Sequence, residues 1–331
     1  MATERAATNR RRPLALFVGA LVAVVIAAGV VVVATRAGGD SSPAPPPSAR
    51  TLAAELARAR RPDPAVPVAT THRFDAGRAL ELVRMQLAVG QRPSGSRRLA
   101  RLRTRLLARL PQGRREPVAG HPGLYNLVGR LPGRLPAVVL AAHYDTQIEP
   151  RGFVGANDSA AGTAVVLEAA RALGRAARPT DAREVRFVLL DGEELPPGGD
   201  DAHFERDGLR GSKAYAAAHA GELGAVAVAD YVAGRGLRLP RERQSDLPLW
   251  SRVAAAAGRA GVGRVFPVED GPAIVDDHLP FLEAGVPAVD LIDWDYPYKQ
   301  GTGDRLERLS ARAIDATGET LVGWLDAERR R

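Results

Sequence analysis

Short apolar runs alternate with helical segments from Leu124 onward, and this alternation most constrains the fold of the 331-residue chain. The apolar runs have strand length and carry few charges, which is typical of strands buried on both faces. The predicted strands cover residues 124–130, 137–142, 184–190, 224–230 and 287–292, and the predicted helices cover residues 159–175, 211–220, 246–260, 277–284 and 310–327. This order predicts one α/β domain with a mostly parallel central sheet flanked by helices.

Two further helices are predicted before the first strand. Asp75 can cap a helix that runs to about Val89, and a second helix covers Ser96 to Leu110. The second helix has a stripe of leucines, and its arginines lie off that stripe. No aromatic residue is interleaved for base stacking, so a solvated helix face explains these arginines better than a nucleic-acid groove. We therefore expect no nucleic-acid partner.

The N-terminal region contains a segment suited to a membrane. Residues 14–34 carry no charged or polar side chain and, at about 1.5 Å per residue, reach about 31 Å, enough to cross a bilayer core. Three arginines precede the segment and only Arg36 follows it. The positive-inside rule then predicts a cytoplasmic N-terminus at 1–13, a single transmembrane anchor at 14–35 and an extracytoplasmic domain. The alternative is a cleaved signal peptide and a secreted protein, although cleaved apolar cores are usually about 7–15 residues long.

A linker is predicted between this anchor and the folded domain. Residues 36–71 begin with a run rich in proline, alanine and serine, which has no means of burying a core. The folded domain is expected to begin near residue 51 or, more firmly, near residue 72, so that residues 72–331 form the main domain. The chain has no cysteine, so any metal ion must be held by His, Asp or Glu.

Imidazole and carboxylate groups follow several of the predicted strands. His143 and Asp145 come directly after the strand at 137–142, and residues two apart on an extended backbone point to the same side. The later groups are Asn157-Asp158-Ser159, Asp191 to Glu194, Asp230, and the tract from Ala288 to Asp304. Asp158 alone would be explained as a helix cap. Sites form at the carboxyl edge of parallel sheets, so we expect these groups to converge.

Such a convergence predicts a metal site. Carboxylates brought close together repel one another, and a divalent cation removes that cost. Imidazole and carboxylate ligands without thiolate suit zinc, with manganese or cobalt as alternatives.

The order His-x-Asp, Asn-Asp, Glu-Glu, Asp resembles the zinc aminopeptidases of the bacterial leucyl-aminopeptidase type and the related glutaminyl cyclases. The resemblance covers roughly residues 72–327 and includes the blocks QRPSGS, AHYDT, GANDSAAG, LLDGEE and DDHLPFLEAGVPAVDLID. It implies a zinc-exopeptidase-like domain. By the family pattern, His143, Asp158 and Asp230 bind a first zinc ion, while Asp158 also bridges to a second ion bound by Glu194.

The same resemblance implies two catalytic residues. Glu193 would be the general base that activates water, and Asp145 would hold the imidazole of His143 in orientation. On the residues alone, adjacent glutamates are usually exposed to solvent, but a pair at the end of a buried strand is less usual.

The second zinc ion lacks a ligand in this pattern. Where the family has histidine in a Tyr-Trp-His-Thr block, this chain has Gln300. An amide oxygen is a poor zinc ligand compared with imidazole, so we expect one intact site and one damaged site. His203, in the polar loop after Glu194, could replace the missing ligand, but an isolated histidine in such a loop is usually just exposed. The resemblance also suggests a substrate pocket lined by Asp277 and His278. Trp294, Tyr296 and Tyr298 either form a wall of that pocket or pack below it.

Three functions remain open at this point. The first is a membrane-anchored, extracytoplasmic zinc aminopeptidase acting on peptides, favoured by Glu193 and the intact first site. The second is a glutaminyl cyclase, favoured by the long loop after Glu194 and opposed by Gln300, because the substituted ligand belongs to the site that single-zinc cyclases use. The third is a catalytically impaired relative that binds peptides, which Gln300 favours.

Overall fold

The computed structural model describes residues 44–331 and contains one six-stranded sheet with the order β1-β2-β4-β3-β5-β6. Its strands are β1 (Arg114–Pro117), β2 (Tyr125–Leu131), β3 (Arg134–His143), β4 (Arg183–Leu190), β5 (Leu223–Asp230) and β6 (Ala288–Ile292). The pairs β4–β3, β3–β5 and β5–β6 are parallel, whereas β1–β2 and β2–β4 are antiparallel. The α/β fold and the five predicted strands are confirmed. The sheet is mixed, with its parallel part confined to four of the six strands.

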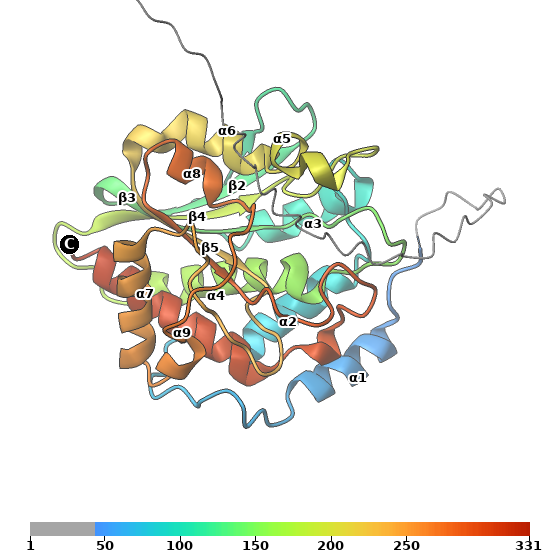
Figure 1. The fold of residues 1–331 in the computed structure, drawn as a ribbon, viewed down its shortest axis with the longest axis horizontal. Helices are drawn as coiled ribbons and strands as arrows, with labels where there is room; N and C mark the ends of the chain where they lie inside the picture. Colours follow the sequence, from blue (N-terminus) through green and yellow to red (C-terminus); the bar gives the residue numbers. More distant parts are fainter. Residues whose placement is uncertain (1–43) are drawn as a thin grey trace, which may run out of the picture. The chain divides into compact units, whose positions relative to one another are not determined.

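Helices cover both faces of this sheet (Figure 1). The helices are α1 (Ala49–Ala59), α2 (Ala76–Leu87), α3 (Arg97–Leu107), α4 (Gly162–Arg175), α5 (Phe204–Asp207), α6 (Arg210–His219), α7 (Leu247–Arg259), α8 (Leu279–Glu283) and α9 (Ala311–Glu328). Side chains of α6 and α8 pack on one face of the sheet, and side chains of α2, α4, α7 and α9 pack on the other. The predicted cap of α2 is confirmed, because Asp75 accepts a hydrogen bond from the backbone N–H of Arg78. Ser96 precedes α3 and caps it by accepting a hydrogen bond from the backbone N–H of Leu99.

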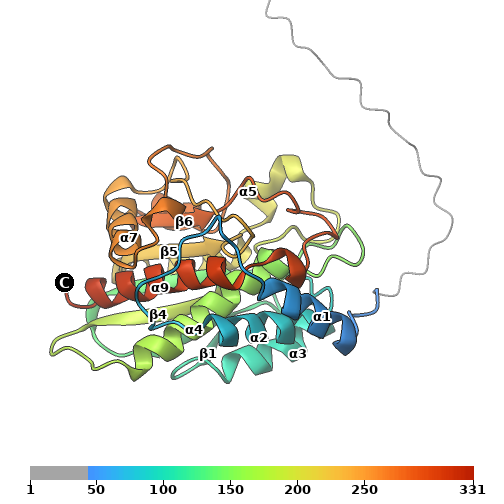
Figure 2. The same cartoon turned by 90° about the horizontal axis from the view of Figure 1, so that it is seen from below.

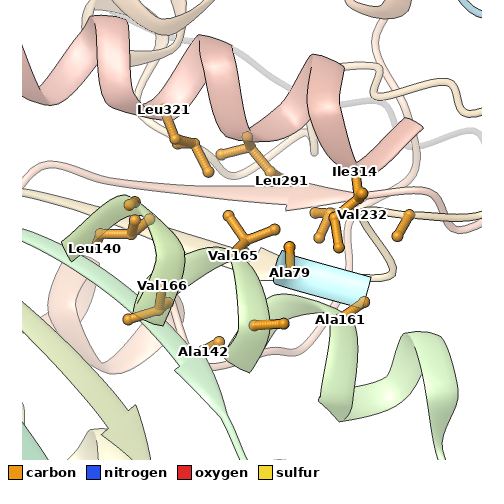
Figure 3. Packing of buried hydrophobic residues seen from close by; sticks show 14 of the residues in the cluster. Ala79, Leu140, Ala142, Ala161, Val165, Val166, Val232, Leu291, Ile314 and Leu321 are labelled. Carbon is orange, nitrogen blue, oxygen red and sulfur yellow. The ribbon is translucent and has the colours of Figure 1, made fainter. Parts of the chain in front are cut away.

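Strand β3 shows how the two layers share the sheet. Leu140 and Ala142 point into the larger core, where they join Val165 of α4 and Leu321 of α9 (Figure 3). Ala141 points the opposite way, toward the core formed with α6 and α8. Successive strand residues alternate between the faces, so the doubly buried part of β3, residues 137–142, needs apolar side chains at every position. Because both faces of β3 are buried, the strand is held firmly in the sheet, and the positions of the residues that follow it are fixed.

The predicted linker at 36–71 was wrong from residue 49 onward, because residues 49–59 form helix α1. Leu52 and Leu56 are buried, lie one turn apart and join the main core. Glu55 pairs with Arg305 at 2.6 Å, and α1 lies beside α2 (Figure 2). The Pro-rich composition just before this helix concealed its short apolar stripe in the sequence.

The predicted cytoplasmic segment at 1–13 and the predicted anchor at 14–35 lie outside the described residues. Within residues 44–331, none of the helices has the combined length and apolar character that crossing a bilayer requires.

Candidate metal centre

Three predicted ligands meet at the carboxyl edge of the parallel strands. His143 ends β3, Asp230 ends β5, and Asp158 lies in the turn that precedes α4. The imidazole Nε2 of His143 is 3.2 Å from Asp158 Oδ1 and 3.6 Å from Asp230 Oδ1. One donor atom from each of the three buried residues lies within 4.8 Å of the other two. These side chains come from segments up to 87 residues apart in sequence (230 − 143), so only the sheet brings them together.

Two more predicted residues face the other nitrogen of the same imidazole. Nδ1 of His143 is 3.5 Å from Asp145 Oδ1 and 3.6 Å from Glu193 Oε2. Asp145 Oδ1 also accepts a hydrogen bond from the backbone N–H of Glu193 at 3.3 Å. Asp145 therefore contacts both the imidazole and the backbone of the residue predicted to be the general base.

The electrostatics of this group favour a bound cation. Burial raises the pKa of Asp230 to about 8, and nearby Asp158 adds to the rise. Burial likewise raises the pKa of Glu193 well above its ordinary range, although His143 opposes the shift. Burial alone would lower the pKa of His143, but the surrounding carboxylates raise it well above its ordinary value. The site is therefore arranged to hold positive charge, either as an imidazolium or as a metal ion.

The residues present fit a zinc ion. Asp158 Oδ1 is buried and accepts no hydrogen bond from any residue between 44 and 331, although it faces His143 Nε2. An uncompensated buried carboxylate oxygen is costly, and a metal ion would satisfy it. Imidazole nitrogen and carboxylate oxygen are both zinc ligands in proteins, and three protein ligands leave a coordination position open in catalytic sites.

Asp158 is held in place by two residues to which the sequence assigned no role. The carboxylate of Asp304 accepts hydrogen bonds from the backbone N–H groups of Asn157 and Asp158 at 3.0 and 3.1 Å. The hydroxyl of Tyr231 donates to Asp158 Oδ2 at 2.7 Å. Tyr231 directly follows Asp230 at a strand end, which was an available signal. Asp304 lies in an irregular loop, and no sequence pattern marks its role.

Arg92, from the QRPSGS block, fixes the segment between Asp145 and Asp158. Its guanidinium is fully buried and donates to the backbone carbonyls of Tyr144, Val154 and Gly155 and to the hydroxyl of Ser159. Burial lowers the pKa of Arg92 to about 10, while Asp158 and Asp145 act in the opposite direction. A buried cation thus joins both ends of the segment that carries two of the site's carboxylates.

A cavity of about 470 Å³ opens onto this group and is called here the reaction cavity. Its lining residues are Gln147, Asp158, Glu193, Glu194, Asp201, Phe204, Asp230, Tyr231, Ala273, Ile274, Val275, Asp276, Ile292, Trp294 and Gln300. Trp294 therefore lines it as predicted. Gln300 also lines it, with an exposed side chain and a backbone carbonyl that accepts a hydrogen bond from Gln147 at 3.0 Å. Glu194 and Gln300 thus border the same cavity as Asp158, where the resemblance places a second ion.

Three of the residues predicted to line the pocket do not line this cavity. Asp277 and His278 are fully buried, and His278 Nε2 lies 3.0 Å from Glu242 Oε2. The turn before α8 directs Asp276 to the cavity and its two successors into the interior. Tyr298 instead lines a separate hollow. The guanidinium of Arg308 stacks over the Tyr298 ring, with its carbon 4.4 Å from the ring centroid.

His203 does not replace the ligand missing at Gln300. Its side chain is 49% exposed, and its Nδ1 lies 3.3 Å from Asp200 Oδ2. The neighbouring Asp201 and Phe204 line the reaction cavity, whereas His203 is not among the lining residues. The position of His203 agrees with the simpler expectation that it is an exposed histidine without a role in metal binding.

The sheet brings one imidazole and several carboxylates to the carboxyl edge of its parallel strands, an arrangement suited to binding a metal ion. The chain belongs to peptidase family M28, whose sequence model matches residues 126–325. The family suggested by the sequence blocks is thereby confirmed.

Two curated relatives carry different activities in their names. Glutaminyl-peptide cyclotransferase of Bos taurus is 27% identical over an alignment of 244 residues, which covers 61% of this chain and 65% of the relative. Aminopeptidase YwaD of Bacillus subtilis is 29% identical over an alignment of 195 residues, which covers 56% of this chain and 39% of the relative. The chain thus spans less than two thirds of the length of these curated relatives.

Solved structures share this fold. A glutaminyl cyclase from an Acidobacteriales bacterium matches with a TM-score of 0.69 and 26% identity, covering 79% of this chain and 97% of that chain. A leucine aminopeptidase precursor from Bacteroides thetaiotaomicron shares the fold, with a TM-score of 0.67 and 21% identity over 78% of this chain and 99% of that chain. The family and fold are therefore established, while both activities occur among similar proteins.

Proposed function

We propose that this protein is a zinc-dependent aminopeptidase that removes N-terminal residues from peptides. The observation that carries the proposal is the buried group of His143, Asp158 and Asp230, with Glu193 beside it in the reaction cavity. This group is complete without residue 300. The altered residue, Gln300, belongs to the other predicted ion, so it leaves the first site intact.

In the proposed mechanism, His143, Asp158 and Asp230 would hold a zinc ion, which when bound would supply a Lewis acid for the scissile carbonyl. Glu193 lines the cavity beside His143, a position from which a carboxylate can act as a general base. It accepts a proton from the attacking water while the new C–O bond forms. It then returns that proton to the leaving nitrogen as the C–N bond breaks. Asp145 holds both Glu193 and His143 in position, because its carboxylate contacts the backbone N–H of Glu193 and the imidazole of His143.

Asp276 is the residue that we assign to the substrate's N-terminal ammonium. It is 4% exposed and lines the reaction cavity, and its Oδ2 has no hydrogen-bond partner within residues 44–331. A buried carboxylate oxygen without a donor is suited to a positively charged amine. Sequence reasoning placed the neighbouring Asp277 in the substrate pocket instead.

A glutaminyl cyclase is the second candidate, because several solved relatives with the same fold carry that name. In that reaction the substrate's own amine attacks its side-chain amide and ammonia leaves. Gln300 weighs against this activity, because it replaces the histidine ligand of the zinc site that single-zinc glutaminyl cyclases use. A peptide-binding relative without catalysis is the third candidate, and the retention of Glu193 and the first-site ligands weighs against it.

We further propose that residues 14–35 anchor the protein in the cell membrane, with residues 1–13 cytoplasmic and the catalytic domain extracytoplasmic. The uninterrupted apolar run and the arginines before it support this arrangement. Its substrates would then be peptides outside the cytoplasm.

The test is an aminopeptidase assay on the purified full-length chain with added zinc, using peptides with different N-terminal residues, including glutamine. The wild-type chain should release free N-terminal amino acids, and Glu193→Gln should lower kcat by about 100-fold or more, because general-base catalysis contributes about that much. Loss of ammonia from the glutamine peptide without hydrolysis would support the cyclase instead. No turnover by either protein, with matching circular dichroism spectra, would contradict both enzymatic proposals.

A further inference from the structure

A second hollow, here called the outer hollow, continues the reaction cavity. Its volume is about 600 Å³, and it shares Gln147, Glu194, Asp201, Phe204 and Gln300 with the reaction cavity. The two hollows therefore form one trough that begins at the proposed metal group. A peptide whose N-terminus lies at that group has this trough available for the residues that follow the scissile bond.

The trough carries only acidic charge. Seven carboxylates line the two hollows, yet none of their lining residues is Arg, Lys or His. The contrast matters because the chain contains 46 basic residues and has a net charge of +8. Four of the seven carboxylates are already assigned to metal binding and catalysis, and Asp276 is assigned to the substrate's ammonium. Glu149 and Asp201 remain without a role.

Glu149 and Asp201 have no compensating partner in the described part of the chain. Within residues 44–331, neither carboxylate forms a hydrogen bond or ion pair, whereas the adjacent Asp200 pairs with His203. Asp201 borders both hollows, so it lies at the junction between them.

A buried residue also directs an unpaired carboxylate into the trough. Glu194 is 9% exposed and lines both hollows, and its carboxylate has no hydrogen bond or ion pair with another described residue. Phe204 and Leu195 add an apolar wall beside it. Acidic groups next to an apolar wall suit a long cationic side chain, whose methylene stem packs while its charged end pairs.

We propose that the outer hollow binds a lysine or arginine side chain of the peptide, located downstream of the residue that is removed. Glu149 and Asp201 are the specificity-determining residues. This inference rests on the proposed aminopeptidase function and adds a substrate class to it: peptides with a basic residue among the second to fourth positions.

The test compares peptides that differ only in charge. Peptides with N-terminal leucine carry arginine at the second, third or fourth position, and their partners carry glutamine there. For the best position, kcat/KM should favour arginine by about fivefold to tenfold, the range for one or two exposed ion pairs, mainly through KM. The preference should fall as salt is added. Asp201→Asn with Glu149→Gln should bring the ratio close to one.

A matched control uses Glu205, an exposed carboxylate of α5 that lines neither hollow. Glu205→Gln should keep the wild-type preference. Hydrolysis without any preference for arginine in the wild-type chain would overturn the inference and leave the aminopeptidase proposal standing.

A binding measurement separates the two proposals if no peptide is hydrolysed. Fluorescence anisotropy of the same peptides, labelled at their C-termini, should then show tighter binding of an arginine peptide than of its glutamine partner. It should also show loss of that difference in the double variant. Equal affinities would overturn the assignment of the outer hollow, whereas absent hydrolysis alone would count against the proposed function.

Discussion

Gln300 is the residue on which the number of bound metal ions should depend. It lines the same cavity as Asp158 and Glu194, but its neutral amide binds zinc poorly. We predict that Gln300→His raises the zinc content from one to two ions per chain, measured by mass spectrometry of metals after dialysis against dilute zinc. Gln300→Asn keeps an amide and should leave the content unchanged. A histidine variant with no additional zinc would refute a second site at this position.

The principal ligands could be predicted from sequence, whereas the residues around them could not. His143 and Asp230 each end an apolar strand, so local patterns place both at the edge of the sheet, whereas only the resemblance to the family marked Asp158 as a ligand and not a helix cap. Asp304 and Arg92 act through contacts with distant segments, the first with the backbone of Asp158. Such roles exist only after the chain has folded and leave no mark on local periodicity.

The same limit explains the pocket residues that were misplaced. In the run Asp276-Asp277-His278, the sequence gives no means of deciding which side chain faces the cavity. The backbone turn before α8 decides it, and it selects Asp276. Adjacent residues of this turn therefore differ in environment: Asp276 lines the cavity, whereas Asp277 is buried in the interior.

Among the elements, α1 was the principal omission. Its apolar stripe is short and follows a Pro-rich segment, and β1 was also missed because its sequence, Arg-Arg-Glu-Pro, contains no apolar run. Strands β3 to β6 were predictable because burial on both faces demands continuous apolar sequence. Elements at the edge of the domain need fewer apolar residues, so their sequence patterns are harder to recognise.

Helix α1 should contribute to the stability of the domain. Leu52 is 1% exposed within the main core. We predict that Leu52→Ala lowers the free energy of unfolding by about 2–4 kcal/mol, because it removes a buried side chain and leaves a cavity. Urea denaturation monitored by circular dichroism measures the change.

Val268→Ala is the matched control for this substitution, since Val268 is 99% exposed. It should change the stability by less than about 0.5 kcal/mol. If Leu52→Ala behaved like this control, α1 would not be an integral part of the domain.

On the scale of the whole molecule, the strand order assembles the site. The adjacent parallel strands β4, β3, β5 and β6 end at one edge of the sheet. That edge receives Glu193 after β4, His143 at the end of β3, Asp230 at the end of β5, and the tract with Trp294 and Gln300 after β6. The alternation of strands and helices predicted a common edge, but the order of the strands within the sheet became known only from the structure.

The central claim is that this edge holds a metal ion through His143. The most direct measurement is the zinc content of the purified full-length chain and of His143→Ala after identical dialysis, with His203→Ala as a control for loss of an exposed imidazole. We predict one zinc ion per wild-type chain, nearly none in His143→Ala and no change in His203→Ala, with all three proteins giving the same circular dichroism spectrum. Equal zinc in the wild-type and His143→Ala proteins would contradict the account.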